Sequence, residues 1–390
     1  MMLGLLALIC VVAATESGPV AMPIPMHKIA DNEAVTSVCW NVAAGAEYTH
    51  TFSGLTEPAL TLHIEDAVLQ RPQDIVLCAG SFCRANHKGG RSFWTAPLGL
   101  GNATAVTVRV MGPASGCIDK MAQLSATRRR PAGRLAASRQ HMTTGCSTNK
   151  DDTIAAKCSA SGSCNSMPAV YDRAAATASI MFQKNGGWYV CTAWASSNTG
   201  HMFTNNHCIS TQEVANTVEF FFGCEMSCNY DASSCDYNSA LTGSAKCGRC
   251  DVNTAYNTAC YSQMSGSQAS GATMLRTSST LDYTLLRVST PQNVACFADP
   301  SCPMRLVPSN YAVGRPNVFM FQHSAGKPKV LSYFDSPDPG HITTGRLQIR
   351  GVSGGCYAGD LAYDADAVGG SSGSVVALAP DYCNPSSGQR

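Results

Sequence analysis

The sequence predicts an all-β protein in which a small, disulfide-bonded, β-sandwich-like domain precedes a larger region with sandwich or barrel architecture. Three observations support this fold class. Short runs with period-two alternation recur between Gly, Ser, Asn and Pro residues, no long amphipathic helix is evident, and 20 of the 390 residues are cysteines. The chain is long enough for two domains, or for one large domain with a pro-region.

The first 15 residues predict a signal peptide. An apolar stretch runs from Leu5 to Ala14 and stops at Thr15 and Glu16, which makes it too short to cross a bilayer. No later segment approaches the ~18 uninterrupted apolar residues of a membrane helix. We therefore expect a secreted, extracellular protein with no membrane partner, whose cysteines are bridged because the secretory route is oxidising.

Residues 16–123 predict a β-rich N-terminal domain or pro-region. Alternation within Leu60–Ile64 and within Val106–Val110 indicates half-buried strands, and Asn102 opens a possible glycosylation acceptor, Asn-Ala-Thr. Four cysteines can close this segment on itself as two bridges: Cys39, Cys78, Cys83 and Cys117.

Residues 124–149 predict an exposed basic linker. The segment contains Arg128-Arg129-Arg130-Pro131 and shows no periodicity. Such a cluster in a secreted precursor is either a processing site or a solvated linker that is never cut, and the sequence leaves both interpretations open.

The overall charge excludes some classes of partner. The formal net charge is +1 and charged residues make up 14% of the chain, well under the ~25% typical of soluble domains. No nucleic-acid partner is implied. We also expect no cofactor, no metal and a monomeric state.

From residue 150 to residue 390 short strands return. Six cysteines between Cys224 and Cys260 resemble a loop insertion stapled to itself. Many short strands separated by turn-forming residues suggest a sandwich or barrel. The expected strands cover Ser179–Phe182, Val218–Phe222, Thr284–Val288, Val318–Phe321, Arg346–Arg350 and Val375–Leu378.

Three segments of this region carry residue types suited to acyl transfer. That chemistry needs a hydroxyl nucleophile, an imidazole base, a carboxylate that orients the imidazole, and backbone N–H groups for the oxyanion. His207 lies in Thr-Asn-Asn-His-Cys, Asp282 begins an apolar strand, and Ser372 lies in the glycine turn Gly-Gly-Ser-Ser-Gly-Ser. The chain order His, Asp, Ser is that of the chymotrypsin-type triad.

The region from Cys158 to the end resembles the trypsin-like peptidases, and most of all the lysyl endopeptidase branch. The resemblance implies a chymotrypsin-like double β-barrel. The matching positions are Cys158 and Cys164, Val190-Cys191-Thr192, Asn206-His207-Cys208, Asp282-Tyr283-Thr284-Leu285-Leu286, His323 with Gly326 and Lys329, and Gly370-Ser371-Ser372-Gly373-Ser374.

The resemblance assigns a role to each residue of the site and implies a secreted serine endopeptidase that acts on protein or peptide substrates. Ser372 would be the nucleophile, His207 the general base and acid, and Asp282 the group that holds the imidazole tautomer. The N–H groups of Gly370 and Ser372 would form the oxyanion hole. It also implies two disulfides, Cys191–Cys208 beside the histidine and Cys164–Cys228.

Three alternatives compete with this assignment. Ser371 fits the Gly-x-Ser-x-Gly elbow of α/β-hydrolases, but that fold requires a histidine after the serine, and the last histidine is His341. The cysteines at 224, 228, 247 and 250 have a zinc-like spacing, although a secreted chain favours their oxidation. The third alternative is a secreted, catalytically inactive protease-fold protein that acts as a binding module.

Specificity, activation and the end of the chain complete the expectations. Asp366 lies where trypsin-like enzymes place the acidic base of the primary specificity pocket, which would favour cleavage after Lys or Arg; a solvated loop Asp is the equal alternative.

Ser371 replaces the Asp that buries a new amino terminus in pancreatic trypsins. Few residues follow Ser372, and removal of Cys10 with the signal peptide leaves an odd number of cysteines. We therefore expect a C-terminally incomplete barrel whose missing tail holds the partner of Cys158.

Overall fold

The computed structural model confirms an almost wholly β protein. The described helices are short: α2 (Pro168–Tyr171), α3 (Gln212–Thr217) and α5 (Ala295–Ala298). None of the helices among the described residues could cross a membrane. The structure describes residues 9–13, 20–22, 26–57, 59–124, 154–159, 168–225, 268–304, 306, 318–326, 328–332, 349–351, 361–363 and 369–378.

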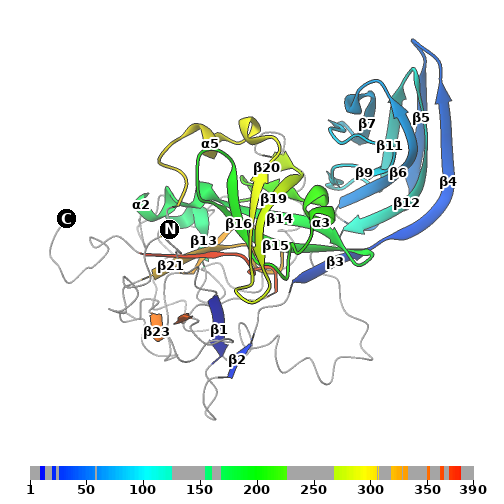
Figure 1. Cartoon of the computed structure of the whole chain (residues 1–390). Coiled ribbons are helices and arrows are strands. Elements are labelled where there is room, and N and C mark those ends of the chain that lie inside the picture. The colour runs from blue at the N-terminus through cyan, green and yellow to red at the C-terminus, as the bar shows by residue number, and fades with distance from the viewer. Residues whose placement is uncertain are drawn as a thin grey trace, which may run out of the picture.

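The N-terminal domain is a sandwich of two antiparallel sheets, which stands to one side of the rest of the chain (Figure 1). One sheet has the order β10-β6-β12-β4 with β9 paired to β6, and the other has the order β5-β11-β7-β8. The strands are β4 (Glu33–Val42), β5 (Glu47–Ser53), β6 (Ala59–Leu69), β7 (Ile75–Ala79), β8 (Phe82–Ala85), β9 (Phe93–Trp94), β10 (Leu98–Gly99), β11 (Ala105–Met111) and β12 (Ala114–Leu124).

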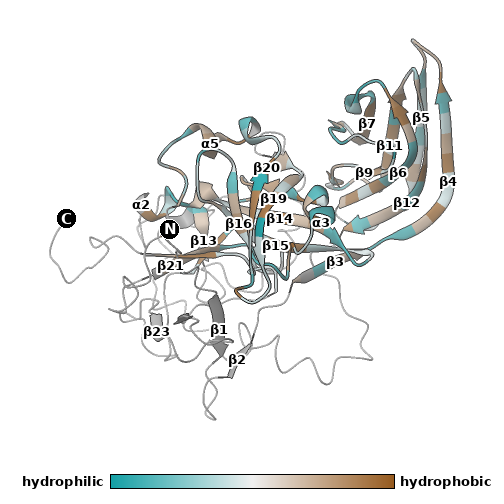
Figure 2. Cartoon of the chain, viewed as in Figure 1, coloured by the Kyte–Doolittle hydropathy of each residue, from teal (hydrophilic) through white to brown (hydrophobic). Residues whose placement is uncertain are grey.

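Strand β11 shows the burial that its sequence predicts. Val106, Val108 and Val110 are fully buried while the residues between them are not. Figure 2 shows the same change between hydrophobic and hydrophilic residues along the strands of the sandwich. Period-two alternation places one face of a strand in the core and the other in water. The sandwich core therefore follows directly from the sequence pattern.

Strand β6 departs from the same prediction, because both of its faces are buried. Thr61 and His63 alternate with leucine and isoleucine but are also inaccessible. The hydroxyl of Thr61 donates to the carbonyl of Thr95 at 2.6 Å, and the ring of His63 lies 5.1 Å from that of Trp94. Ala59, on the same face of β6, belongs to a buried cluster with Trp94 of the paired strand β9 and Trp188 of the second unit, so packing between the two units covers the face that the alternation would leave to water. Hydrogen bonds satisfy the buried hydroxyl of Thr61.

Two disulfides close the sandwich as the cysteine pattern allows. Cys39 bonds Cys117, joining the neighbouring strands β4 and β12, and Cys78 bonds Cys83, joining β7 and β8. A third bridge, Cys296–Cys302, was not predicted and lies outside the sandwich. The sandwich therefore has covalent links within each of its two sheets.

The second unit contains a six-stranded arrangement of the double-barrel type, with the order β17-β14-β15-β16-β20-β19 and an added strand β18 on β17. In this order the fourth strand along the chain returns to pair with the first, and the sixth pairs with the third, which is a Greek-key connection. The strands are β14 (Thr177–Lys184), β15 (Gly187–Ala195), β16 (His201–Thr204), β17 (Glu219–Phe221), β18 (Gln268–Ser270), β19 (Ala272–Ser278) and β20 (Tyr283–Val288).

A second sheet belongs to the later part of the chain and has the order β13-β22-β21-β25. Its inner face buries Phe319, Phe321 and Leu331. Its strands are β13 (Ile154–Ala155), β21 (Val318–Gln322), β22 (Val330–Ser332) and β25 (Val375–Leu378). Strand β25 follows the predicted serine turn, so this sheet carries the nucleophile segment and the barrel sheet carries the histidine and aspartate segments.

A third, small sheet includes the start of the chain. Strand β1 (Ile9–Ala13) pairs with β2 (Val20–Met22) and, in parallel, with β24 (Leu361–Tyr363), which pairs with β23 (Ile349–Gly351). Strand β1 lies within the predicted signal peptide, so this sheet belongs to the uncleaved chain, and the signal peptide itself stays a prediction.

The two units share a buried interface. Strand β3 (His27–Asp31), at the start of the sandwich, pairs antiparallel with β15 of the barrel. A common core contains Ile29, Trp94 and Leu124 from the N-terminal part and Trp188 and Phe221 from the barrel. The rings of Trp94 and Trp188 lie 5.6 Å apart in an edge-to-face arrangement. The N-terminal domain is therefore packed against the barrel, while the predicted domain boundaries and the linker stay predictions.

Candidate active site

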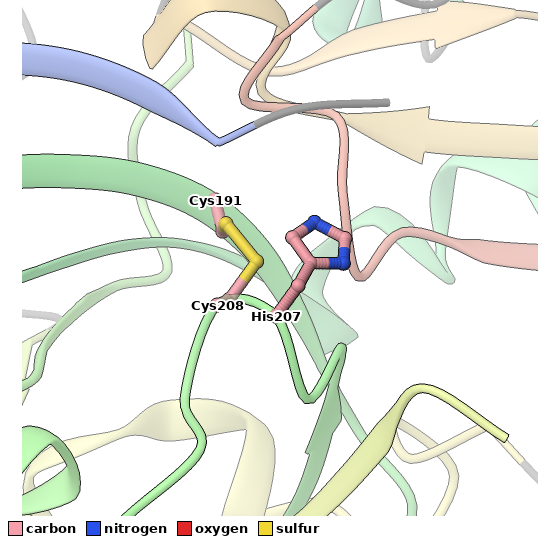
Figure 3. Close-up of side chains that lie close together, drawn as sticks. All are labelled: Cys191, His207 and Cys208. Atoms are coloured by element: carbon pink, nitrogen blue, oxygen red, sulfur yellow. A yellow bond between two sulfur atoms is a disulfide. The ribbon is translucent and has the colours of Figure 1, made fainter. Parts of the chain in front are cut away.

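Strand β15 holds two parts of the site through consecutive residues. Cys191 forms the expected disulfide with Cys208, the residue after His207. The N–H of the next residue, Thr192, donates to the carbonyl oxygen of Ser372 at 2.7 Å. Both contacts come from a strand that is buried at every residue except the half-buried Tyr189. The histidine segment and the serine segment are thereby fixed to the same short stretch of the barrel, as Figure 3 shows for the histidine and the bridge.

His207 and Asp282 form a two-point contact. Nδ1 of His207 lies 2.6 Å from Oδ2 of Asp282, and the backbone N–H of His207 donates to Oδ1 at 2.7 Å. Asp282 has a φ of 43°, in the left-handed region, and Nδ2 of Asn205 donates to its carbonyl at 2.8 Å. An aspartate in this region is tolerated where its surroundings hold it. The turn before β20 is therefore shaped around this carboxylate.

The contact with Asp282 fixes which ring nitrogen of neutral His207 carries the proton. An ionised carboxylate only accepts hydrogen bonds, so the proton of neutral His207 lies on Nδ1 and leaves Nε2 as an acceptor. Nε2 is buried and has no hydrogen-bond partner among the described residues. Lys184 donates to the carbonyl of His207 at 2.7 Å, and burial lowers the pKa of this lysine while the charge of Asp282 opposes that shift. The ring is thus prepared to accept a proton.

The serine lies in a turn that requires glycine. Gly370 and Gly373 have φ values of 99° and 87°, and a β-carbon at Gly373 would lie 2.1 Å from the carbonyl oxygen of Thr192. The hydroxyl of Thr192 donates to the carbonyl of Gly370 at 2.9 Å. Ser372 is 3% exposed within this turn. Only glycine allows the turn to approach β15 this closely.

The same turn orients the N–H of Ser372. The N–H of Ser374 donates to the carbonyl of Ser371 at 3.0 Å, so that carbonyl points into the turn. In a trans peptide the following N–H points the opposite way. The N–H of Ser372 therefore faces away from the turn, as an oxyanion donor requires. The assignment of Gly370 and Ser372 to an oxyanion hole stays a prediction.

Several predicted residues lie outside the described part of the chain. Asp366, Cys164 and Cys228 are among them, so the specificity pocket and the Cys164–Cys228 bridge stay predictions. Cys224 is disulfide-bonded, which removes it from the zinc-like set. Cys191, His207 and Cys208 also lie close together, but the two sulfur atoms are bonded to each other and offer no thiolate to a metal.

Sequence reasoning missed a second histidine cluster, in the sandwich. Nδ1 of His63 lies 2.5 Å from Asp119, and Nε2 lies 3.1 Å from the hydroxyl of Ser92, which also donates to Glu65 at 2.7 Å. The hydroxyl proton of Ser92 therefore goes to Glu65 and not to the ring of His63. This cluster has the residue types of a catalytic triad, but its serine hydroxyl donates to a carboxylate and not to the imidazole.

Comparisons with known proteins give one curated relative. Secreted RxLR effector protein 73 of Plasmopara viticola is 32% identical over 197 residues, which cover 50% of this chain and 40% of the relative. The chain thus matches less than half the length of that protein. No protein-family model matches the chain.

The solved structures that match part of this chain include proteases. A thermostable serine protease, AL20, from an extremophilic microorganism has 14% identity and a TM-score of 0.26, covering 54% of this chain and 81% of that one. The protease Anisep of Arthrobacter nicotinovorans has 14% identity and a TM-score of 0.27, covering 53% and 79%. A scabies mite inactivated protease paralogue has 12% identity and a TM-score of 0.26, covering 53% and 79%. The lysyl endopeptidase branch is not singled out by these comparisons.

Proposed function

We propose that this chain is the precursor of a secreted serine endopeptidase that uses Ser372, His207 and Asp282. The observation that carries the proposal is the linkage through β15. Cys191 and Thr192 are consecutive, and they tie down the histidine and the serine segments, respectively. Acyl transfer depends on holding a nucleophile and its base in one geometry. A covalent bridge and a buried backbone hydrogen bond are a rigid means of doing so.

The proposed reaction follows from the protonation of His207. Nε2 takes the hydroxyl proton of Ser372 as the oxygen attacks the peptide carbonyl carbon, and the imidazolium is stabilised by Asp282. The same proton then passes to the leaving amine as the peptide C–N bond breaks and an acyl-enzyme forms. Water, deprotonated by Nε2, hydrolyses that ester and restores Ser372. The N–H groups of Gly370 and Ser372 would stabilise both oxyanions.

A fluorophosphonate probe tests the nucleophile directly, because it reacts with an activated serine hydroxyl and needs no knowledge of the substrate. The full chain should be labelled at Ser372, and the Ser372→Ala variant should not. Ser371→Ala is the matched control, since it changes the neighbouring hydroxyl, which contacts Ser324 at 2.9 Å. Unlabelled wild-type protein that is correctly folded would contradict the proposal, and labelling lost only in Ser371→Ala would assign the nucleophile to Ser371.

Cleavage after Lys or Arg is the proposed specificity, with Asp366 as the acidic group that pairs with the substrate side chain. A buried carboxylate at the base of a pocket favours a cationic side chain because of charge-assisted hydrogen bonding. A peptide library should show cleavage after basic residues, and Asp366→Ala should lose that preference. A preference for apolar residues would contradict this specificity.

A second candidate function is a secreted, inactive protease-fold protein that acts by binding. The observation that favours it is the curated relative, which is named as a secreted effector. The two candidates differ in one result. An inactive binder should capture its partner equally well as wild type and as Ser372→Ala and should not react with the probe, whereas an endopeptidase reacts with it.

A further inference from the structure

The edge of β15 next to the site is already occupied by a strand of this same chain. Strand β14 covers one edge of β15 from Gly187 to Trp194. Strand β3 therefore lies on the other edge, where His27 pairs with Val190 and Asp31 pairs with Gly187. The hydrogen bond from Thr192 to Ser372 also leaves β15 on that edge. Strand β3 and the segment that carries Ser372 therefore lie next to each other along the same edge of β15.

The distance along this edge is short. Val190 and Thr192 are two residues apart, which is ~7 Å in an extended strand. Met26, just before β3, is half-buried and packs against the core cluster that contains Cys191 and Cys208. In Figure 3 the blue ribbon of β3 runs beside the green strand β15, which carries Cys191. The beginning of β3 thus lies beside the site.

Strand β3 runs in the same N-to-C direction as the part of a peptide substrate that follows the cleaved bond, which is the leaving-group side. Because β3 is antiparallel to β15, its amino-terminal end points toward Thr192 and its chain then runs away from Ser372. In peptide hydrolysis the residues that follow the cleaved bond run away from the nucleophile in the same N-to-C direction. Extended peptides commonly bind by adding a strand to a free sheet edge. On this edge, β3 takes the place that such a peptide would need.

Several contacts hold β3 and the sandwich on the barrel. Ile29 of β3 is fully buried in the common core. Gly187 admits the backbone of β3, since a β-carbon there would lie 3.1 Å from the carbonyl oxygen of Ala30. Farther along the interface, Nζ of Lys88 lies 2.5 Å from Oε1 of Glu219, which is wholly buried. The occupant is thus part of a packed domain interface.

We propose that the N-terminal domain is an intramolecular inhibitor, whose strand β3 occupies the leaving-group side of the cleft by strand addition to β15. This proposal rests on the proposed endopeptidase function of the same site. It explains how activity could be restrained in a chain where Ser371 stands in place of an activating aspartate. The inhibited substrates are peptides that extend beyond the cleaved bond, while a small reagent at Ser372 does not need the β15 edge.

The test compares two reagents on the full chain: a fluorophosphonate probe, which reacts at Ser372, and a fluorogenic peptide with three residues beyond the cleaved bond. Gly187→Ala and Ile29→Ala loosen β3 from its two sides. Leu77→Ala is the matched control, because Leu77 is equally buried but lies in the sandwich core. Circular dichroism verifies that each variant is folded.

We expect each loosening variant to cleave the extended peptide at least about tenfold faster than wild type, because the open edge becomes a larger fraction of the population. Probe labelling should stay within about twofold of wild type, and Leu77→Ala should resemble wild type in both assays. Normal probe labelling with equal peptide cleavage in wild type and all three variants would overturn the proposal that the N-terminal domain is an inhibitor. Absence of probe labelling in all four proteins would instead overturn the proposed endopeptidase function, so the two failures are distinguishable.

Discussion

Asp282 holds His207 with both carboxylate oxygens, one on the ring and one on the backbone of the same residue. The ring contact selects the tautomer, and the backbone contact fixes the position of the residue that carries the ring. A carboxylate in this arrangement therefore does more than balance charge. It leaves Nε2, and not Nδ1, as the ring nitrogen that can accept a proton.

Replacing Asp282 by Asn should lower turnover about 10⁴-fold with little change in folding, because an amide can donate to Nδ1 and select the wrong tautomer. The measurement is the rate of probe labelling at Ser372 as a function of pH. Ser92→Ala is a useful control, since the sandwich cluster has similar residue types but its serine hydroxyl donates to Glu65 and not to the histidine. A rate that falls in Ser92→Ala and not in Asp282→Asn would contradict the assignment of the site.

The candidate site residues could be predicted from local sequence patterns, whereas the packing around them could not. His207, Asp282 and Ser372 each lie in a short local pattern whose residue types are dictated by the chemistry, so they could be found without knowing the packing. The bridge at Cys191 came from a resemblance in the same way. These residues carry their signal in their immediate neighbours along the chain.

The domain interface could not be found by such reasoning. Glu219 meets Lys88 and His87 from far along the chain, and nothing beside Glu219 in the sequence indicates a buried carboxylate. The burial of both faces of β6 has the same cause, since Thr61 is covered by a segment that begins some 30 residues later. Contacts between distant segments leave no periodic pattern in either one.

Removing the Cys191–Cys208 bridge should destabilise the barrel by ~3 kcal/mol, since a closed loop of this length restricts the unfolded chain by about that amount. The double Cys→Ala variant should also lose most probe labelling, because the bridge positions the residue next to His207. The matched control removes Cys78–Cys83 in the sandwich, whose partners are 5 residues apart. That variant should keep its labelling rate. Thermal unfolding and labelling together measure both effects, and equal loss of labelling in the two variants would argue against a positioning role.

Buried Lys329 forms an ion pair with partly buried Glu225, and uncharged residues of similar shape should replace this pair better than a small residue replaces Lys329. Nζ of Lys329 is wholly buried, lies 3.0 Å from Glu225, and also donates to the carbonyls of Ala174 and Phe222. Burial lowers the pKa of Lys329, and Glu225 opposes that shift. Lys329→Ala should cost about 3 kcal/mol of unfolding free energy, because it empties a buried site and leaves the partly buried carboxylate of Glu225 without its cation.

The double variant Lys329→Met with Glu225→Gln separates packing from charge. It keeps the volume and removes both charges, so its unfolding free energy should lie within about 2 kcal/mol of wild type. Chemical denaturation measures all three proteins. A double variant as unstable as Lys329→Ala would show that the charges themselves stabilise this part of the fold.

Glu219 should make the domain interface sensitive to acid. Burial alone would raise the pKa of Glu219, but the charge of Lys88 and the hydrogen bond from His87 outweigh it and lower the pKa to about 2, from an ordinary value of 4.5. A group with a lowered pKa stabilises the folded state above its unfolded pKa, and that contribution is lost as the pH falls from 4.5 toward 2. Interface contacts should therefore weaken over that window.

The fluorescence of Trp94 and Trp188, whose rings meet across the interface, should report this weakening. Glu219→Gln removes the titrating group, so its unfolding free energy should be lower than that of wild type at neutral pH but should fall less between pH 4.5 and 2. Glu213→Gln is the matched control, because Glu213 is exposed and the described ion pair of Lys88 is with Glu219. Parallel acid titrations of wild type and Glu219→Gln would contradict the assigned role of Glu219. If the N-terminal domain restrains the site as proposed, wild type should also gain activity toward extended peptides after brief acid exposure, because release of the sandwich and opening of the β15 edge depend on the same buried contact.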